Sequence, residues 1–195
     1  IPFCKIKIPQ KKYYLPLLGF SICMGAGVNM FLYLSLEAAS ILAPITIGAQ
    51  LSIPLAIILS SMFLSESISF KKWILIFTSF LGIVLIAFDP KISEEILAII
   101  LVFTMAFFYG LSQVFSRYLK SLDVKLTNTY MSFVGFITLL FLSMIFEKNV
   151  ADHFFSIEFN TWLLILHSAI LVSLGAHMSM FYLYKFYTVD KVLPF

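Results

Sequence analysis

Residues 96–116, ILAIILVFTMAFFYGLSQVFS, form a run of 21 residues without a charged side chain, between Glu95 and Arg117. An α-helix rises 1.5 Å per residue, so about 20 apolar residues cross the hydrocarbon core of a bilayer. Apolar side chains occupy all faces of this run, as expected of a helix that meets lipid or other helices on every side. The stretch therefore predicts a transmembrane helix.

Further uncharged runs lie on both sides of this one. The run at 73–88 has only 16 residues, so we expect it to recruit Phe70 and to let Lys71 and Lys72 extend toward the interface. The fold class predicted is all-α, a polytopic membrane helix bundle with six spans in this chain. The other uncharged runs cover residues 13–36, 38–65, 126–146 and 159–184.

The composition of the whole chain agrees with a membrane protein. Its 195 residues are 61% hydrophobic and 12% charged, and their mean hydropathy is +1.01. Soluble domains carry about 25% charged residues, and disordered chains are poor in the apolar residues that abound here. With only two cysteines in the chain, a disulfide-rich secreted scaffold is excluded as well.

The basic residues predict the orientation of the chain. If six spans alternate in direction, only Lys91 and Lys148 lie on the second face. The positive-inside rule makes the first face cytoplasmic. Because these residues are spread over several loops close to the membrane, we expect the lipid bilayer as a partner and no nucleic acid. The first face holds Lys5, Lys7, Lys11, Lys12, Lys71, Lys72, Arg117, Lys120, Lys125, Lys185 and Lys191.

An internal repeat appears at an offset of 150 residues. Residues 25–44 (GAGVNMFLYLSLEAASILAP) and 175–194 (GAHMSMFYLYKFYTVDKVLP) agree at five of 20 positions without a gap. Chance matches between apolar helices are the alternative explanation. The two copies lie five spans apart, so they would cross the membrane in opposite directions, as in secondary transporters built from inverted repeats.

The segment within 17–88, "FLYLSLEAASILAPITIGAQLSIPLAIILSSMFLSESISFKKWILIFTSFLGIVLIAF", resembles part of an EamA domain of the drug/metabolite transporter superfamily. Residues 96–195, with "FYGLSQVFSRYLK" and "GAHMSMFYLYKFYTVDKVLP", resemble a second EamA domain. The resemblance implies a ten-helix inverted-repeat transporter. Residues 1–89 would then hold the C-terminal three helices of the first repeat, and 90–195 the N-terminal three of the second, with two helices missing at each end.

The resemblance also implies a function. We expect a secondary transporter in the bacterial cytoplasmic (inner) membrane that moves small metabolites, amino acids or their derivatives or drugs, in the direction of export by alternating access. The alternatives are an uptake or exchange carrier for S-adenosylmethionine or nucleotide-type metabolites, and a non-catalytic membrane subunit. An enzyme is not expected, because the HExxH, GxSxG and phosphate-binding motifs are missing from the sequence.

Five polar residues within the spans are the candidate substrate-binding residues. Asn29 and Gln50 carry amides that need a polar partner or water, and an interhelical hydrogen bond is the alternative role of each. Tyr109 and Gln113 share one helix face, with Ser116 a further three residues along, although Tyr109 could also pack in the core. His177 is a candidate for proton coupling, and a structural hydrogen bond is its alternative role.

Other polar and helix-breaking residues suggest structural roles. Pro54 should bend the helix that contains it. Glu66 suits an interfacial cap or a salt bridge with Lys71 rather than a substrate ligand. The two histidines His167 and His177 lack further ligands at metal-binding spacing, so neither a metal site nor a cofactor is expected.

Overall fold

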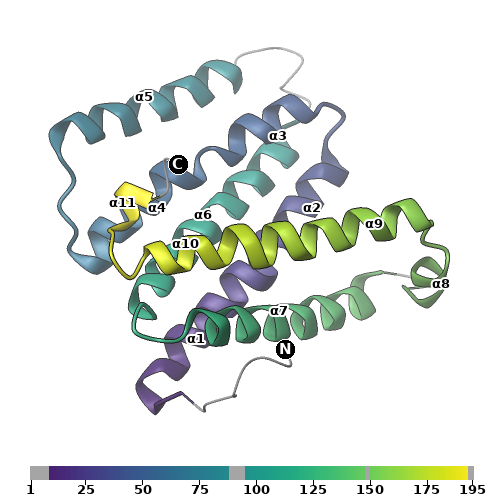
Figure 1. The fold of residues 1–195 in the computed structure, drawn as a ribbon. Helices are drawn as coiled ribbons and strands as arrows, with labels where there is room; N and C mark the ends of the chain where they lie inside the picture. The colour runs from purple at the N-terminus through teal and green to yellow at the C-terminus, as the bar shows by residue number, and fades with distance from the viewer. Residues whose placement is uncertain (1–8, 88–94, 148–149, 193–195) are drawn as a thin grey trace.

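The computed structural model describes residues 9–87, 95–147 and 150–192, which form helices joined by turns with no strand among them (Figure 1). Lys5, Lys7, Lys91 and Lys148 lie outside the described residues. The helices are η1 (Lys11–Tyr13), α1 (Tyr14–Phe20), η2 (Ser21–Gly27), α2 (Val28–Ala38), α3 (Leu42–Ala49), α4 (Ser52–Leu64), α5 (Phe70–Ala87), α6 (Ile96–Tyr118), α7 (Val124–Phe146), α8 (Val150–Phe155), α9 (Phe159–His167), η4 (Ser168–His177), α10 (Met178–Leu183) and α11 (Val189–Val192).

Five helical stretches in the described part are long and apolar enough to cross a membrane: Lys11–Ala38, Leu42–Leu64, Ile96–Tyr118, Val124–Phe146 and Phe159–Leu183. The chain is therefore a multi-pass membrane protein, and five of the six predicted spans are present at that length. The remaining run forms α5, a helix of 18 residues that is not among the five. It is the short run for which the sequence already predicted a contribution from the flanking Phe70 and lysines.

Helix α6 lies at the centre of the packing. It contacts α1, η2, α2, α3, α4 and α11. Small residues allow the close approaches: a Cβ on Gly110 would stand 3.1 Å from the backbone nitrogen of Ala56, and a Cβ on Gly48 would stand 2.6 Å from the Val102 side chain. Close helix packing of this kind is the main source of association between helices in a bilayer, where the hydrophobic effect is absent.

The basic residues gather at one end of the bundle. In Figure 1 the start of α1, the α4–α5 connection, the α6–α7 turn and the α10–α11 turn lie together on the left, whereas the α2–α3 turn and α8 lie on the right. This arrangement agrees with the predicted alternation of the spans. We call the left end the basic end; it carries Lys11, Lys12, Lys71, Lys72, Arg117, Lys120, Lys125, Lys185 and Lys191.

The second long stretch is broken at Gln50 and Leu51, between α3 and α4. Pro54 has no backbone N–H for the carbonyl of Gln50, four residues earlier, and its ring clashes with that carbonyl in a straight helix. The Gln50 carbonyl accepts from the Ile53 N–H at 3.2 Å instead. The bend predicted from Pro54 is confirmed. Gln50, expected inside an apolar helix, has an exposed side chain at this break.

Two π-helical segments occupy equivalent positions of the sequence repeat. Segment η2 ends at Gly27 and η4 ends at His177, and these residues are 150 positions apart. Asn29 Nδ2 donates to the Gly25 carbonyl at 3.0 Å, and at the matching position Ser179 Oγ donates to the Gly175 carbonyl at 2.8 Å. Bonds of the same type also occur within the regular helices α6 (Thr104 to Ile100) and α7 (Thr129 to Lys125), so it is the combination with a π-helical segment that the two spans share.

Candidate functional site

Gln113, one of the predicted site residues, lies at the centre of a buried polar cluster. Its side chain on α6 is fully buried. The Tyr184 hydroxyl, just past α10, donates to Gln113 Oε1 at 2.6 Å, and Gln113 Nε2 donates to Ser112 Oγ at 3.2 Å. Because the one hydroxyl hydrogen of Ser112 goes to the Tyr109 carbonyl, its oxygen can only accept from Gln113, so the amide NH₂ group faces Ser112 and the amide oxygen faces Tyr184.

The hydrogen-bonded chain continues along α6. Ser112 Oγ donates to the Tyr109 carbonyl at 2.6 Å and lies 3.5 Å from Met24 Sδ of η2. The hydroxyl of Tyr109 reaches Met180 Sδ of α10 at 3.8 Å. The first long helix, α6 and α10 therefore all contribute side chains to one region.

His177 adjoins this region from the last span. It is partly buried, its ring lies 6.2 Å from the ring of Phe181 in a stacked arrangement, and Phe181 in turn meets Phe20 edge to face at 5.2 Å. His177 and Met180 are three residues apart and share a helix face. The Nδ1 atom of His177 is buried and finds no hydrogen-bond partner within the described ranges. We call Tyr109, Ser112, Gln113, His177 and Tyr184 the polar cluster.

The structure thus brings together three of the five predicted residues: Tyr109, Gln113 and His177. Asn29 donates to the carbonyls of Met24 and Gly25 in its own helix, at 3.3 and 3.0 Å, so its hydrogen bonds are neither interhelical nor part of the cluster. Gln50 lies at the α3–α4 break, apart from the cluster. The side chains of Asn29 and Gln50 therefore lie outside the polar cluster.

Tyr184 and Ser112 are cluster residues that the sequence did not single out. Tyr184 stands next to Lys185 at the end of an uncharged run, where a tyrosine normally marks the membrane interface. It is fully buried instead. A usable signal was present, because 184 follows 177 by seven residues, two helical turns, which places both side chains on one face.

The chemistry that these groups offer is binding through neutral donors and acceptors. Two phenols, a hydroxyl, an amide, an imidazole and the two methionine sulfurs surround the region, and aromatic rings from Phe20 and Phe181 line one side. Within the described part of the chain, no group of three or more His, Cys, Asp or Glu is placed to hold a metal ion.

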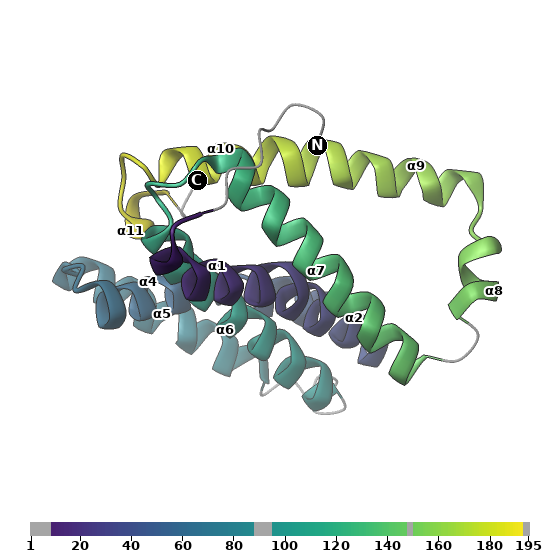
Figure 2. The ribbon, with the colours of Figure 1, turned by 90° about the horizontal axis from the view of Figure 1, so that it is seen from below.

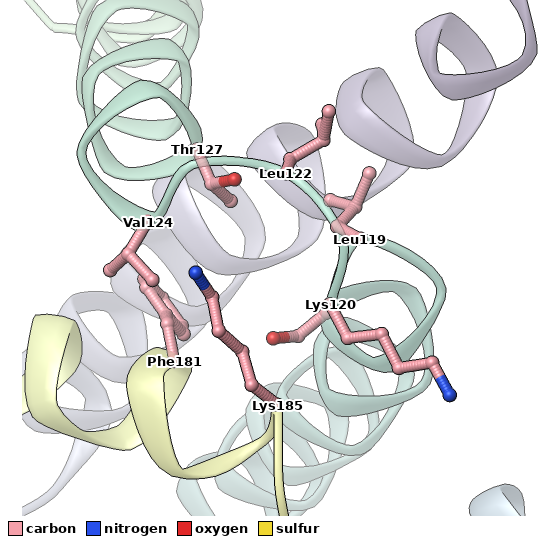
Figure 3. Close-up of a pocket in the computed structure, with 8 residues that line it drawn as sticks. Leu119, Lys120, Leu122, Val124, Thr127, Phe181 and Lys185 are labelled. Atoms are coloured by element: carbon pink, nitrogen blue, oxygen red, sulfur yellow. The ribbon is translucent and has the colours of Figure 1, made fainter.

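A small pocket adjoins the cluster at the basic end (Figure 3). Its volume of about 10 Å³ has room for about one water molecule. Figure 3 shows the Lys185 side chain running toward Val124 and Thr127, while the Lys120 side chain points away. The lining residues are Ser116, Leu119, Lys120, Leu122, Val124, Thr127, Phe181 and Lys185. Ser116, the third member of the predicted polar stripe, therefore meets a water-sized space.

Glu66 does not pair with Lys71, the partner expected from the sequence. Its Oε1 lies 3.3 Å from Nε of Arg117, the one charged residue of α6. The predicted partner was wrong because Lys71 was chosen for its closeness in the sequence. In the structure α4 packs along α6, which brings Glu66 to the end of that helix. The interfacial, structural role expected for Glu66 agrees with this contact.

Comparisons with known proteins give no family for the chain: no family model, curated protein or solved structure matches it.

Proposed function

We propose that the protein is a secondary transporter of the EamA type in a bacterial cytoplasmic membrane, which carries small neutral or zwitterionic metabolites through the polar cluster by alternating access. The basic end would face the cytoplasm. Amino acids and their derivatives suit the site, because amide and phenol groups can bind their polar ends and the aromatic rings their apolar side chains.

The observation that carries this proposal is the repetition of one backbone feature in the first and last spans. A π-helical segment, a glycine carbonyl and a side-chain donor four residues later recur at an offset of 150. In Figure 1 the α1–α2 stretch and the α9–α10 stretch run in opposite senses. Opposed copies of one unit are the construction on which many secondary transporters rely, with substrate between the repeats.

The position of the polar cluster supports the same proposal. Its members come from α6 and the last span, and Met24 of the first span contacts it. Buried polar groups within a membrane bundle are expensive and commonly mark a substrate or ion pathway. Here the contact between Ser112 and Met24 Sδ joins the cluster in the second half to the first half.

The test is uptake into everted vesicles that contain the protein, with a panel of labelled amino acids and S-adenosylmethionine, with and without a proton gradient. We expect gradient-driven accumulation of at least one compound. A verified, inserted protein that accumulates nothing in everted vesicles, and exchanges nothing in right-side-out vesicles, would contradict the proposal.

A pair of variants ties the activity to the cluster. Gln113→Leu removes the amide at the centre and should lower uptake at least tenfold. Gln50→Ala, at the exposed break, is the matched amide control and should keep most of the activity. Membrane abundance of both variants is measured alongside, since equal losses of uptake and abundance would assign Gln113 to packing.

A further inference from the structure

The two sequence halves are tied together at the basic end by side-chain contacts. Two are ion pairs, Glu66 with Arg117 and Lys72 with Asp190. In addition, the Tyr118 hydroxyl donates to the carbonyl of Phe63 at 2.9 Å. Each contact joins the region before residue 88 to the region after residue 94, so the basic end is closed by bonds between the halves.

The ion pair of Glu66 with Arg117 is sheltered from solvent. The two side chains are 15% and 17% exposed. Ser65, which follows α4, adopts a left-handed backbone with φ of 54°, so the chain turns sharply just before Glu66. A non-glycine residue in that conformation is uncommon, and it persists only where surrounding contacts hold it.

Arg117 connects this pair to the polar cluster. Besides Glu66, its guanidinium donates to the backbone carbonyl of Tyr184, and the Tyr184 hydroxyl donates to Gln113. A continuous path therefore runs from the α4–α5 connection to the site. The end of α4 cannot separate from the end of α6 without breaking the ion pair of Glu66 with Arg117.

The pair is incompletely satisfied, which suits a contact that must open. Glu66 Oε2 is buried and has no hydrogen-bond partner in the part of the chain that the structure describes. Burying a charged oxygen without a partner costs free energy and offsets part of the attraction to Arg117. In the closed arrangement, the attraction between Glu66 and Arg117 is therefore partly offset by the cost of burying the unpaired oxygen of Glu66.

We propose that Glu66–Arg117 and Lys72–Asp190 form a gate that closes the basic end over the polar cluster, with Arg117 as the residue that couples the gate to the site. This inference rests on the transporter proposed above. The two ion pairs shift the equilibrium between the closed and open states toward the closed state, which is the arrangement described here. Opening separates α4 and α5 from α6 and α11. The size of that shift is the difference in free energy between the two states.

The experiment measures access to the cluster rather than transport. In a background with Cys4→Ala and Cys23→Ala, Ser112→Cys places a single thiol at a fully buried position of the cluster. Its labelling rate with a membrane-impermeant maleimide is followed from the basic-end side. We expect Glu66→Gln to raise this rate about tenfold, while Lys71→Gln, an exposed neighbour of the gate, leaves it unchanged.

Charge exchange at the second pair keeps the test valid if Glu66→Gln does not fold. Lys72→Asp and Asp190→Lys should each raise labelling, and the double variant should return the rate toward the parent value. Equal rates in the parent, the single variants and the double variant would overturn the gate. An equal increase with Lys71→Gln would overturn it too, because general loosening would then be the cause.

The outcome is separable from that of the transport assay. If the labelling rate rises when the ion pairs are broken, but the protein moves none of the tested compounds, the result would support the gate and contradict the transporter. If the protein takes up a compound, but the labelling rate is the same with and without the ion pairs, the result would support the transporter and contradict the gate.

Discussion

The first and last spans share one local pattern and differ in what surrounds them. Each contains a π-helical segment, followed by a side chain that donates to a glycine carbonyl. The first is packed: Phe20, Met24 and Ala26 are buried. In the last, α9 has no buried residue, and Figure 2 shows α9 well away from α2 and α6, with α10 beside the start of α7.

This difference separates local causes from tertiary ones. The shared side-chain bonds join residues four positions apart, at 25 and 29 in the first copy and at 175 and 179 in the last. Burial depends on the neighbours of each helix: η2 packs along α7, whereas α9 and η4 contact mainly each other and α10. Equivalent substitutions in the two copies should therefore have equal local effects and unequal effects on stability.

The largest contrast is expected at the matched glycines. A Cβ on Gly25 would stand 2.7 Å from the Met131 carbonyl oxygen and 2.9 Å from the Cα of Gly135, whereas a Cβ on Gly175 would meet only the Ile170 carbonyl, at 3.9 Å. Gly25→Leu should thus cost about 1–3 kcal/mol by overpacking. Thermal unfolding in detergent should show a lower Tm for Gly25→Leu and little change for Gly175→Leu.

The comparison would fail if both leucine variants lost the same stability, since the last span would then be packed as tightly as the first. It would fail in the opposite way if Gly25→Leu were neutral, because the close crossing of η2 and α7 at Gly135 would not exist.

A second contrast tests where the last span is anchored. Tyr184→Phe removes the hydrogen bond to the buried Gln113 oxygen and should destabilise the protein by about 1 kcal/mol. The control is Tyr182→Phe, two residues earlier in α10, whose side chain is 56% exposed. Hydrogen exchange of α10 should quicken with the first variant and not with the second; equal exchange would contradict this anchor.

A smaller effect should be seen at the side-chain donors of the π-turns. Asn29→Ala and Ser179→Ala each remove one donor to a glycine carbonyl, at a cost of about 0.6 kcal/mol, the average for side-chain hydrogen bonds within membranes. Both should strengthen the regular backbone bond and slow exchange of the amide at the substituted position. A change in only one copy would show that the shared pattern has two different causes.

The smallest effect is expected when the pH is lowered, and it concerns the basic end. Burial opposes ionisation of Asp190, but the hydrogen bonds from Lys72 and Thr188 outweigh it and lower the pKa of Asp190 from its ordinary value. Its stabilising contribution is therefore complete above that ordinary value, 3.8, and is lost as pH falls through the lower folded pKa. Below pH 4, exchange should quicken in α11 before the first span; simultaneous loosening would contradict this order.

The sequence was sufficient for the elements that depend on uninterrupted hydropathy and on single residues. It predicted the long helices, the gathering of basic residues at one end and the bend at Pro54. The four-residue spacing of Tyr109 and Gln113 predicted that they share a helix face, whereas the position of His177 depends on how the last span packs. The transporter function and the ten-helix architecture remain predictions.

What the sequence could not supply were contacts between distant helices. Gln50 was expected to be buried because its run is apolar, yet the break that Pro54 creates leaves it exposed. Asn29 donates to carbonyls of its own helix rather than to a neighbouring helix. The sequence alone does not decide between these two kinds of acceptor. The partner of Glu66 depends on the packing of α4 along α6. The burial of Tyr184 depends on the packing of α10 against α7 and on the hydrogen bond to Gln113 of α6.

The central claim is that the first and last spans are copies that cross the membrane in opposite directions. With Cys4 and Cys23 replaced by alanine, single thiols from Lys11→Cys and Glu158→Cys mark the starts of these spans. Labelling with a membrane-impermeant maleimide is compared in right-side-out and everted vesicles. The account predicts that the two thiols react from opposite sides, Lys11→Cys from the cytoplasmic side. Reaction of both from the same side would contradict the inverted repeat.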